Sequence, residues 1–302
     1  MSQIQRALGA GLAVAAVVAA AVSAGPAAGG GARLQGNNFY SNCRFSHTGT
    51  DDPIVFPGRP GLSHHHTFFG NRSTNASSTV ASLRRAATTC YPQTDTAAYW
   101  IPTLYQNGRE VRPSKAQVYY VVIGYGRMHA FPQGLRIVAG DMHSTRPQST
   151  RVTYWTCAGR AARTAPSRTI PVHCGVIEGR GLGRARGSSR PTVVRWRTKS
   201  TIELQVVFPD CWDGRRLDSP DHQSHMSYSR GFACPRSHPV KVPRIRLFVR
   251  YPIDRSRGVT LASGSPYTAH ADFFNAWDQR RLERLVASCF QMRGCNPAID
   301  DR

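Results

Sequence analysis

Residues 192–212, TVVRWRTKSTIELQVVFPDCW, contain two successive segments that favour the extended chain. Residues 192–198 and 201–212 are rich in Val, Ile, Thr, Trp and Phe, and such β-branched and aromatic side chains pack well on a pleated surface. Pro209 cannot donate a hydrogen bond to a strand ladder, so it ends the second segment. This stretch therefore predicts two β-strands with no helix between them.

The same kind of sequence recurs along the chain. Its other occurrences, separated by Gly, Pro, Asn or Asp, are residues 116–125, 135–140, 151–159, 244–253 and 258–264. Residues 158–193 are instead rich in Gly, Arg, Ser and Pro and predict a long basic loop. Several strands without intervening helices indicate a mainly β fold, an antiparallel β-sandwich or a jelly-roll-like single domain.

One or two short helices complete the predicted fold. In residues 75–90, NASSTVASLRRAATTC, the pair Ser77 and Ser78 can cap a short helix. In residues 275–289, NAWDQRRLERLVASC, apolar side chains recur at i, i+3, i+4 and i+7. This spacing predicts an amphipathic helix with Asn275 as its cap.

The amino terminus has the pattern of a secretion signal. Residues 1–24 contain Arg6, a short apolar run rich in alanine and a final Val-Ser-Ala that suits signal peptidase. The run is too short for a convincing membrane span. Residues 25–36 predict a flexible lead-in, and residues 37–302 predict a single domain. We expect a secreted, extracellular monomer without a transmembrane segment after signal cleavage.

The eight cysteines are even in number, all follow the signal segment and form no CxxC pair, so we expect a domain stapled by disulfides. Spacing leaves their connectivity open. Pairing of neighbours would close local loops through Cys43–Cys90, Cys157–Cys174, Cys211–Cys234 and Cys289–Cys295.

Basic residues outnumber acidic ones by 39 to 17, which gives a formal net charge of +22. Such a surface attracts polyanions in a salt-dependent way. Outside a cell these include acidic polysaccharides, teichoic acids, nucleic acid and anionic membranes. The alternative is a solvated basic surface that serves solubility alone.

Histidines gather in three segments. In HHHTFFG, residues 64–70, a strand would place His64 and His66 on one face and His65 on the other. The loop-like residues 208–228, FPDCWDGRRLDSPDHQSHMSY, contain four aspartates and two histidines. In YTAHADFFNAW, residues 267–277, a histidine and an aspartate two positions apart would share a strand face.

These segments supply two sets of candidate site residues. The candidate ligands of one divalent metal, zinc or copper, are His64, His66, His225 and His270. The candidate catalytic residues are Asp213, Asp221, His222, Tyr228 and Asp272.

The two sets allow more than one role. Asp213 or Asp221 could act as general base in a metal-assisted hydrolysis. Asp272 could orient His270, serve as a ligand or cap the following helix. Without a metal, a histidine or Tyr228 could instead abstract the proton of a polysaccharide lyase reaction.

Six ordered blocks of the chain resemble the DUF1996 family of secreted bacterial and fungal proteins, over about Asn37 to Cys295. They are DDPIVFPGRPGLSHHHTFFGN, STNASSTVASLRRAATTC, DTAAYWIPTLYQNG, FPDCWDGRRLDSPDHQSHMSY, CPRSHPVKVPRIRLFVRYPI and HADFFNAWD. The resemblance implies a His-x-His pair that maps onto His64 and His66. Similar fungal domains are joined to WSC modules, which implies an association with glycans, but the resemblance implies no reaction.

The leading functional hypothesis is a secreted carbohydrate-active enzyme, a hydrolase or lyase, that acts on cell-wall or acidic polysaccharide. The alternatives are a non-catalytic glycan or cell-wall binder, whose aromatic residues would stack on sugars, and a metal-binding protein without turnover. The chain has no Walker loop, no dinucleotide fingerprint after a strand, no GxSxG elbow and no recognisable nuclease motif. No nucleotide cofactor is therefore expected.

Overall fold

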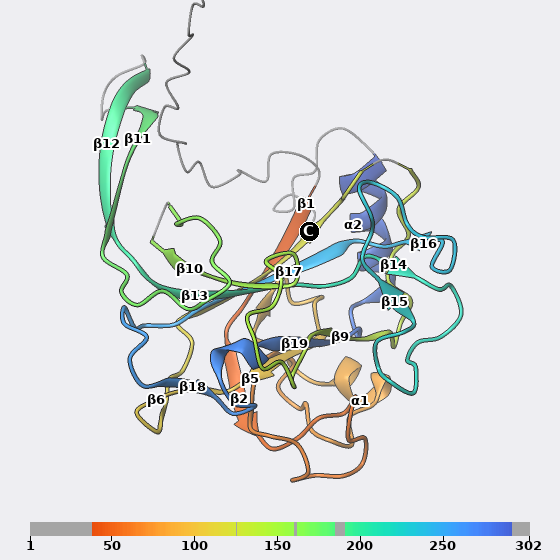
Figure 1. The fold of residues 1–302 in the computed structure, drawn as a ribbon. Coiled ribbons are helices and arrows are strands. Elements are labelled where there is room, and N and C mark those ends of the chain that lie inside the picture. The colour runs from red at the N-terminus through yellow and green to blue at the C-terminus, as the bar shows by residue number, and fades with distance from the viewer. Residues whose placement is uncertain (1–37, 125, 160–161, 185–190, 292–302) are drawn as a thin grey trace, which may run out of the picture. The chain divides into compact units, whose positions relative to one another are not determined.

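The computed structural model describes residues 38–124, 126–159, 162–184 and 191–291 (Figure 1). Two large antiparallel sheets dominate the fold. The first has the strand order β10-β13-β17-β8-β1-β4. Its strands, in chain order, are β1 (Asn38–Cys43), β4 (Cys90–Tyr91), β8 (Lys115–Val121), β10 (Thr153–Ala158), β13 (Thr201–Val207) and β17 (Arg244–Arg250).

The second large sheet has five strands in the order β2-β3-β5-β19-β9. Its strands are β2 (Phe45–Gly49), β3 (His66–Gly70), β5 (Ala98–Pro102), β9 (Arg136–Gly140) and β19 (His270–Phe274). All its strand pairs are antiparallel, so the predicted mainly β, antiparallel, sandwich-like fold is confirmed.

Three small sheets lie outside the two large ones. Their strands are β6 (Leu104–Gln106), β7 (Arg109–Glu110), β11 (Val176–Arg184), β12 (Pro191–Lys199), β14 (Cys211–Trp212), β15 (Met226–Ser227), β16 (Val240–Lys241) and β18 (Val259–Leu261). The prediction of one long loop over residues 158–193 is wrong. β11 pairs with β12 along its whole length, and this pairing overrides the loop-like composition of β11.

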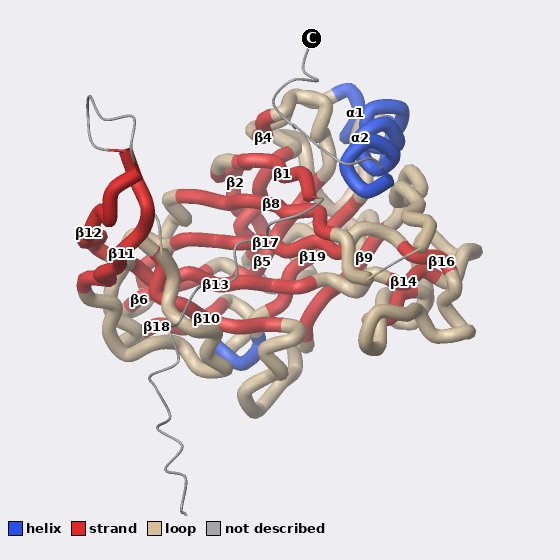
Figure 2. Tube along the Cα trace, turned by 90° about the horizontal axis from the view of Figure 1, so that it is seen from above, coloured by secondary structure: helices blue, strands red, loops and turns tan. Residues whose placement is uncertain are grey.

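Two α-helices and one 3₁₀ segment are present among the described residues: α1 (Val80–Arg85), α2 (Gln279–Gln291) and η1 (Pro266–Thr268). Figure 2 shows the strands as the bulk of the fold, with both α-helices toward one side. Both helices were predicted, but their caps differ. Thr79, and not Ser77 or Ser78, accepts from the backbone N–H of Ser82. Asp278, and not Asn275, accepts from the backbone N–H of Arg281.

The core lies between the two large sheets. Each strand buries alternate side chains there, for example Val118 and Leu204 from the first sheet and Ile101 and Phe273 from the second. The aromatic side chains of Tyr99, Trp100 and Trp277 are fully buried, so they cannot serve the sugar stacking expected of a glycan binder.

A hydrogen-bond network ties the two sheets together inside this core. The Tyr120 hydroxyl of β8 accepts from Nε1 of Trp277 at 2.8 Å. It also shares a hydrogen bond with the Tyr99 hydroxyl of β5, which in turn donates to the buried Asp95 at 2.9 Å. Burial raises the pKa of the Asp95 carboxyl to about 7.

Three disulfides join pairs of described residues: Cys43–Cys90, Cys157–Cys174 and Cys211–Cys234. They are three of the predicted neighbour pairs. The fourth predicted pair includes Cys295, which lies outside the described residues, as do the predicted signal peptide and lead-in. In the described part of the chain, no helix is both long and apolar enough to cross a membrane.

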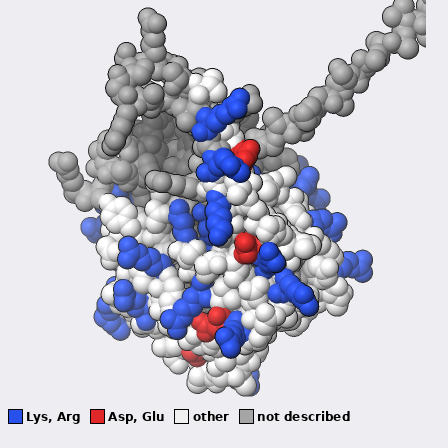
Figure 3. Space-filling model, turned by 90° about the vertical axis from the view of Figure 1, so that its left-hand side faces the viewer, with Lys and Arg blue, Asp and Glu red and all other residues white. Residues whose placement is uncertain are grey.

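The excess of basic residues is visible on the surface. Figure 3 shows a face of the molecule on which Lys and Arg side chains are spread widely and Asp and Glu side chains are few. Arg84, Arg136, Arg216 and Arg244 are among the cations that form ion pairs with aspartates. With 39 basic residues against 17 acidic ones, the acidic side chains can neutralise less than half of the positive charge.

The Tyr120 hydroxyl should contribute measurably to stability. Tyr120→Phe leaves the buried Trp277 N–H without its acceptor, which costs about 1–3 kcal/mol. The control is Tyr119→Phe, on the adjacent half-buried side chain, which should change the unfolding free energy by less than about 0.5 kcal/mol. Denaturant unfolding of the two variants and the wild type measures both, and equal midpoints for the two variants would contradict the role given to Tyr120.

Candidate metal centre

The five-stranded sheet carries histidines on the face that points away from the core. β3 and β19 flank β5, where His66 pairs with Pro102 and Asp272 pairs with Trp100. His270, two residues before Asp272, therefore lies level with Pro102 and on the same face as His66. The centroids of the two imidazole rings are 6.0 Å apart.

His64, just before β3, completes a cluster of three imidazoles. Its ring centroid lies 4.3 Å from that of His66 and 5.0 Å from that of His270. The Nε2 atoms of His64 and His270 are 3.2 Å apart, and one nitrogen from each ring lies within 4.8 Å of the others. His66 and His270 are fully buried, whereas His64 is half-buried, so solvent reaches the cluster from its side.

Backbone carbonyls fix the proton on two of the rings. Nδ1 of His66 lies 3.0 Å from the carbonyl oxygen of Asp51, and Nδ1 of His270 lies 2.8 Å from that of Thr268. Because a carbonyl oxygen only accepts, we assign the proton to each Nδ1 and a lone pair to each Nε2. Nε2 of His66 is buried and has no hydrogen-bond partner among the described residues. Metal-ligating histidines are typically held by such a hydrogen bond from their other nitrogen.

Burial keeps the three imidazoles neutral. It lowers the pKa of His64 to about 4, with a smaller contribution from the charge of His143, and it lowers the pKa of His270 to about 3. Burial, followed by the charges of His64 and His270, holds the pKa of His66 well below its ordinary value. Neutral imidazole is the form that binds a metal, so these lowered pKa values favour metal binding at neutral pH.

Gly140 allows β9 to pass close to His270. The two residues pair across the ladder between β9 and β19, and Gly140 has a φ of +99°, a conformation that favours glycine. A Cβ atom at this position would lie 2.7 Å from the carbonyl oxygen of Ala269 and 2.9 Å from Cα of His270. The position of His270 thus depends on the absence of a side chain at Gly140. This role of Gly140 was not predicted from the sequence.

The histidines next to the cluster have other partners. His65 lies outside the cluster, as the alternation of side chains predicts, and its Nδ1 is 3.1 Å from the Tyr105 hydroxyl. His47 of β2 stacks on Phe68 with ring centroids 4.6 Å apart. Nε2 of His47 also lies 2.8 Å from the carbonyl oxygen of Thr74, to which it donates.

The structure does not give Asp272 the predicted role of orienting His270. Both of its carboxyl oxygens are buried without a hydrogen-bond partner among the described residues, and Nδ1 of His270 donates to Thr268 instead. Asp272 lies within β19, so it is no helix cap either. Burial, and then the charge of Asp52, holds the pKa of Asp272 well above its ordinary value.

The prediction that His225 ligates the same metal is not supported. Its Nδ1 lies 2.8 Å from the Ser219 hydroxyl, and its Nε2 lies 2.6 Å from the carbonyl oxygen of Arg136. Arg136 begins β9, whereas Gly140, beside His270, ends it. Four residues of strand span about 13 Å, so both ring nitrogens of His225 are engaged at the far end of β9.

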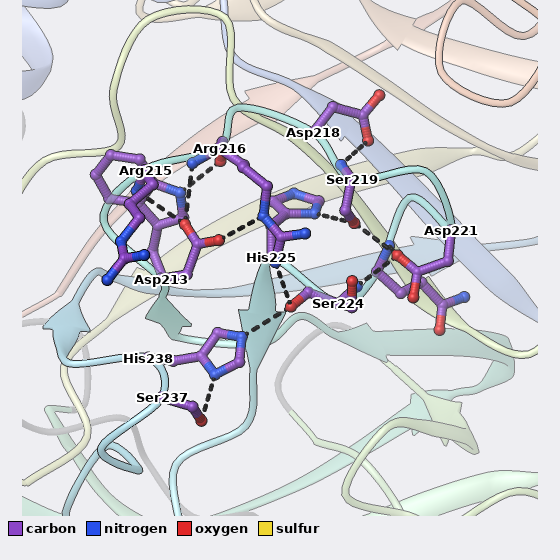
Figure 4. A network of polar contacts seen from close by, with 12 residues as sticks. Asp213, Arg215, Arg216, Asp218, Ser219, Asp221, Ser224, His225, Ser237 and His238 are labelled. Carbon is purple, nitrogen blue, oxygen red and sulfur yellow. Dashed lines mark hydrogen bonds and ion pairs between the residues drawn. The ribbon is translucent and has the colours of Figure 1, made fainter.

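The remaining catalytic candidates, Asp213, Asp221, His222 and Tyr228, are not among the residues that meet in the cluster. Figure 4 shows Asp213 and Asp221 in the polar network around His225. Asp213 accepts from the backbone of Arg215 and Arg216 and pairs with the Arg216 guanidinium at 2.8 Å. Burial raises its pKa, but these hydrogen bonds outweigh burial and lower it to about 2. A carboxylate so occupied fixes a turn and is a poor general base.

Asp221, His222 and Tyr228 also make local contacts. Asp221 accepts from the Ser219 hydroxyl and from two backbone N–H groups, and the Ser219 hydrogen bond is the main cause of its lowered pKa. His222 lies 3.0 Å from the Asp218 carboxylate. The Tyr228 hydroxyl donates to the carbonyl oxygen of Val207, and burial raises its pKa. These contacts indicate structural roles for all three residues.

Comparison with known proteins adds a family without a function. The family model described as "Domain of unknown function (DUF1996)" matches residues 52–277, which include all three histidines of the cluster. No curated protein and no solved structure matches the chain.

Gly140→Ala should displace His270. The added methyl group would overlap Ala269 and His270, so we expect a loss of about 1–3 kcal/mol in the unfolding free energy together with weaker metal binding. Gly108→Ala is the matched control, because Gly108 also has a positive φ, +75°, but a Cβ atom there meets nothing within 4 Å. Denaturant unfolding and zinc titration measure both effects. Equal behaviour of the two variants would show that Gly140 is needed only for its φ.

Proposed function

Since the chain belongs to the DUF1996 family, whose function is unknown, we propose a function from the site itself. The protein is an extracellular, metal-dependent hydrolase of acidic polysaccharide, with one zinc ion held by His64, His66 and His270. The observation that carries this proposal is the convergence of three imidazole rings that each offer one nitrogen within 4.8 Å of the others. Backbone carbonyls hold Nδ1 of two of these rings.

The ligand set favours a catalytic metal over a structural one. Structural zinc sites are closed by four protein ligands, whereas catalytic sites use three and leave a position open. Only three candidate ligands meet here in the described part of the chain, and the half-buried His64 leaves the cluster accessible. Bound zinc would supply a water molecule of lowered pKa, which makes hydrolysis feasible at neutral pH.

The electrostatics support an anionic substrate. Three neutral imidazoles leave the double positive charge of a zinc ion uncompensated. Asp272, the carboxyl nearest His270 along β19, is buried, and burial holds its pKa well above its ordinary value, which disfavours a negative charge beside the ion. With a formal net charge of +22 over the whole chain, the protein would attract a polymer that carries carboxylates, such as a uronic-acid polysaccharide.

Metal content is the primary test of the site. Protein secreted through its own amino terminus and stripped of adventitious metal should bind about one equivalent of zinc per chain. His66→Ala and His270→Ala should each reduce this affinity by at least about tenfold, since ligand support alone is commonly worth that much. His65→Ala is the control and should bind zinc as the wild type does. Mass spectrometry of the metal content and titration measure this, and equal binding by all variants would overturn the site.

Catalysis is tested separately from binding. The zinc protein should release reducing ends from a uronic-acid polymer, lose this activity on chelation and regain it with zinc, and His270→Ala should be inactive. Formation of an unsaturated uronate product, unaffected by chelation, would replace hydrolysis by a metal-free lyase reaction. Tight zinc binding without turnover of any polymer tested would favour a non-catalytic metal-binding protein.

A further inference from the structure

The outer face of the six-stranded sheet, remote from the histidine cluster, carries an unusual set of side chains. The register places Tyr40 of β1 opposite Tyr119 of β8, and Tyr119 opposite Arg246 of β17. Two residues further along the strands, on the same face, Asn42 lies opposite Gln117, and Gln117 lies opposite Phe248. The face thus presents aromatic rings, amides and guanidinium groups where a sheet facing water would ordinarily carry small polar residues.

The aromatic rings form a continuous band. Tyr40 and Tyr119 have ring centroids 5.3 Å apart, and Tyr119 and Phe248 have ring centroids 5.0 Å apart. Phe248 is nearly buried, but Tyr40 is 39% exposed and Tyr119 is half-buried. Flat rings at the surface of a sheet are suited to stacking against the apolar face of a sugar ring.

Cations surround this band. The guanidinium carbons of Arg163 and Arg246 lie 4.8 Å and 5.3 Å from the centroid of the Phe248 ring. Arg163 and Arg250 both pair with one acid, Glu203, at 2.5 Å and 3.1 Å. Glu203 is 1% exposed, so a single buried carboxylate holds two arginines in place and neutralises only one of them.

The positive charges on this face affect the pKa of a neighbouring lysine. Burial, and then the charges of Arg250 and Arg163, lowers the pKa of the exposed Lys115, although Glu203 acts in the opposite direction. Lys115 lies directly opposite Arg250 in the register. Cations so placed repel one another, and an anion bound among them would relieve that repulsion.

The amide groups complete the chemistry. Nε2 of Gln117 donates to Oδ1 of Asn42 at 2.8 Å, which orients both side chains. Gln117 is buried, whereas Asn42 is half-buried, and the amide nitrogen of Asn42 can donate a further hydrogen bond. Such a donor suits the hydroxyl groups of a sugar.

We propose that this surface, the tyrosine–arginine face formed by Tyr40, Asn42, Lys115, Gln117, Tyr119, Arg163, Arg246 and Arg250, binds a chain of a uronic-acid polysaccharide. Tyr40 and Tyr119 stack on sugar rings, Asn42 bonds hydroxyl groups, and the four cations attract carboxylates. Arg163 and Arg250 each donate from Nε and Nη2 to Glu203, so a bound carboxylate meets their remaining N–H groups and their charge. The face belongs to the opposite sheet from the histidine cluster, so this inference does not rest on the proposed function.

The test is binding of polygalacturonate to the mature protein. Affinity should fall with rising salt, and dextran, a neutral polymer, should bind much more weakly. Tyr40→Ala and Lys115→Glu should each weaken polygalacturonate binding about tenfold, which corresponds to about 1.4 kcal/mol, and Tyr40→Phe should retain the wild-type affinity. These side chains are exposed, so their replacement should leave the fold intact, which circular dichroism verifies.

Arg59→Glu is the charge-matched control, because Arg59 is exposed in the loop between β2 and β3 and the change in net charge is the same as in Lys115→Glu. It should bind polygalacturonate as the wild type does. If it weakens binding as much as Lys115→Glu, net charge alone is responsible and the proposed face is wrong. Equal sensitivity of duplex DNA binding to Tyr40→Ala would likewise overturn the assignment to polysaccharide.

Binding at this face should be independent of zinc. The loss of polygalacturonate affinity caused by Tyr40→Ala should be the same in zinc-loaded and in zinc-free protein, because Tyr40 and the histidine cluster belong to different sheets. Loss of zinc binding in the metal tests would thus leave this inference standing, and loss of polygalacturonate binding in Tyr40→Ala with zinc binding intact would leave the metal centre standing. Wild-type affinity in both Tyr40→Ala and Lys115→Glu would refute the proposal.

Discussion

The alternation of side chains along the five-stranded sheet is the constraint on which both the core and the candidate site depend. Phe69, Tyr99 and Phe273 point inward and hold the sheet against its partner. The residues between them point outward, so His66, Trp100 and Asp272 reach the other face. A shift of one residue in the pairing would exchange the two sets and turn His66 and Asp272 toward the apolar core between the sheets. The pairing that keeps this core apolar therefore fixes the position of the histidines as well.

Local features of the site could be predicted from the sequence because they depend on a single strand. Alternation alone separates His64 and His66 from His65. That His270 meets them depends on the pairing of β5 with both β3 and β19, and nothing in the residues themselves specifies that order. The partner of His225 could not be predicted for the same reason. Its Nε2 lies within hydrogen-bond distance of a backbone carbonyl of β9, a strand far away in the sequence. Backbone partners of this kind leave no trace in the side-chain sequence.

Amino-acid composition gives the wrong secondary structure where the pairing of two strands determines the conformation of a segment. β11 contains the glycines and arginines of a loop, yet it forms a nine-residue strand because β12 offers it a full ladder. The predicted helix caps were a few residues too early. Thr79 and Asp278 lie closer to the first helical turn than the residues predicted from the sequence. The fold class could be predicted because it depends on many residues, and the disulfide pairs could be predicted because they close short loops. The contacts that individual side chains make with residues far away in the sequence could not be predicted.

The three imidazoles are not held with equal firmness, which has a kinetic consequence. His66 and His270 belong to strands in the interior of a sheet, whereas His64 precedes its strand and is half-buried. Segments outside the ladder open far more often than strands within it. A bound ion would thus be held by His66 and His270, whose strands keep them in place, and it would dissociate when His64 moves away from it. Its residence time would be governed by the loop before β3, while the geometry of the bound state would be governed by the sheet.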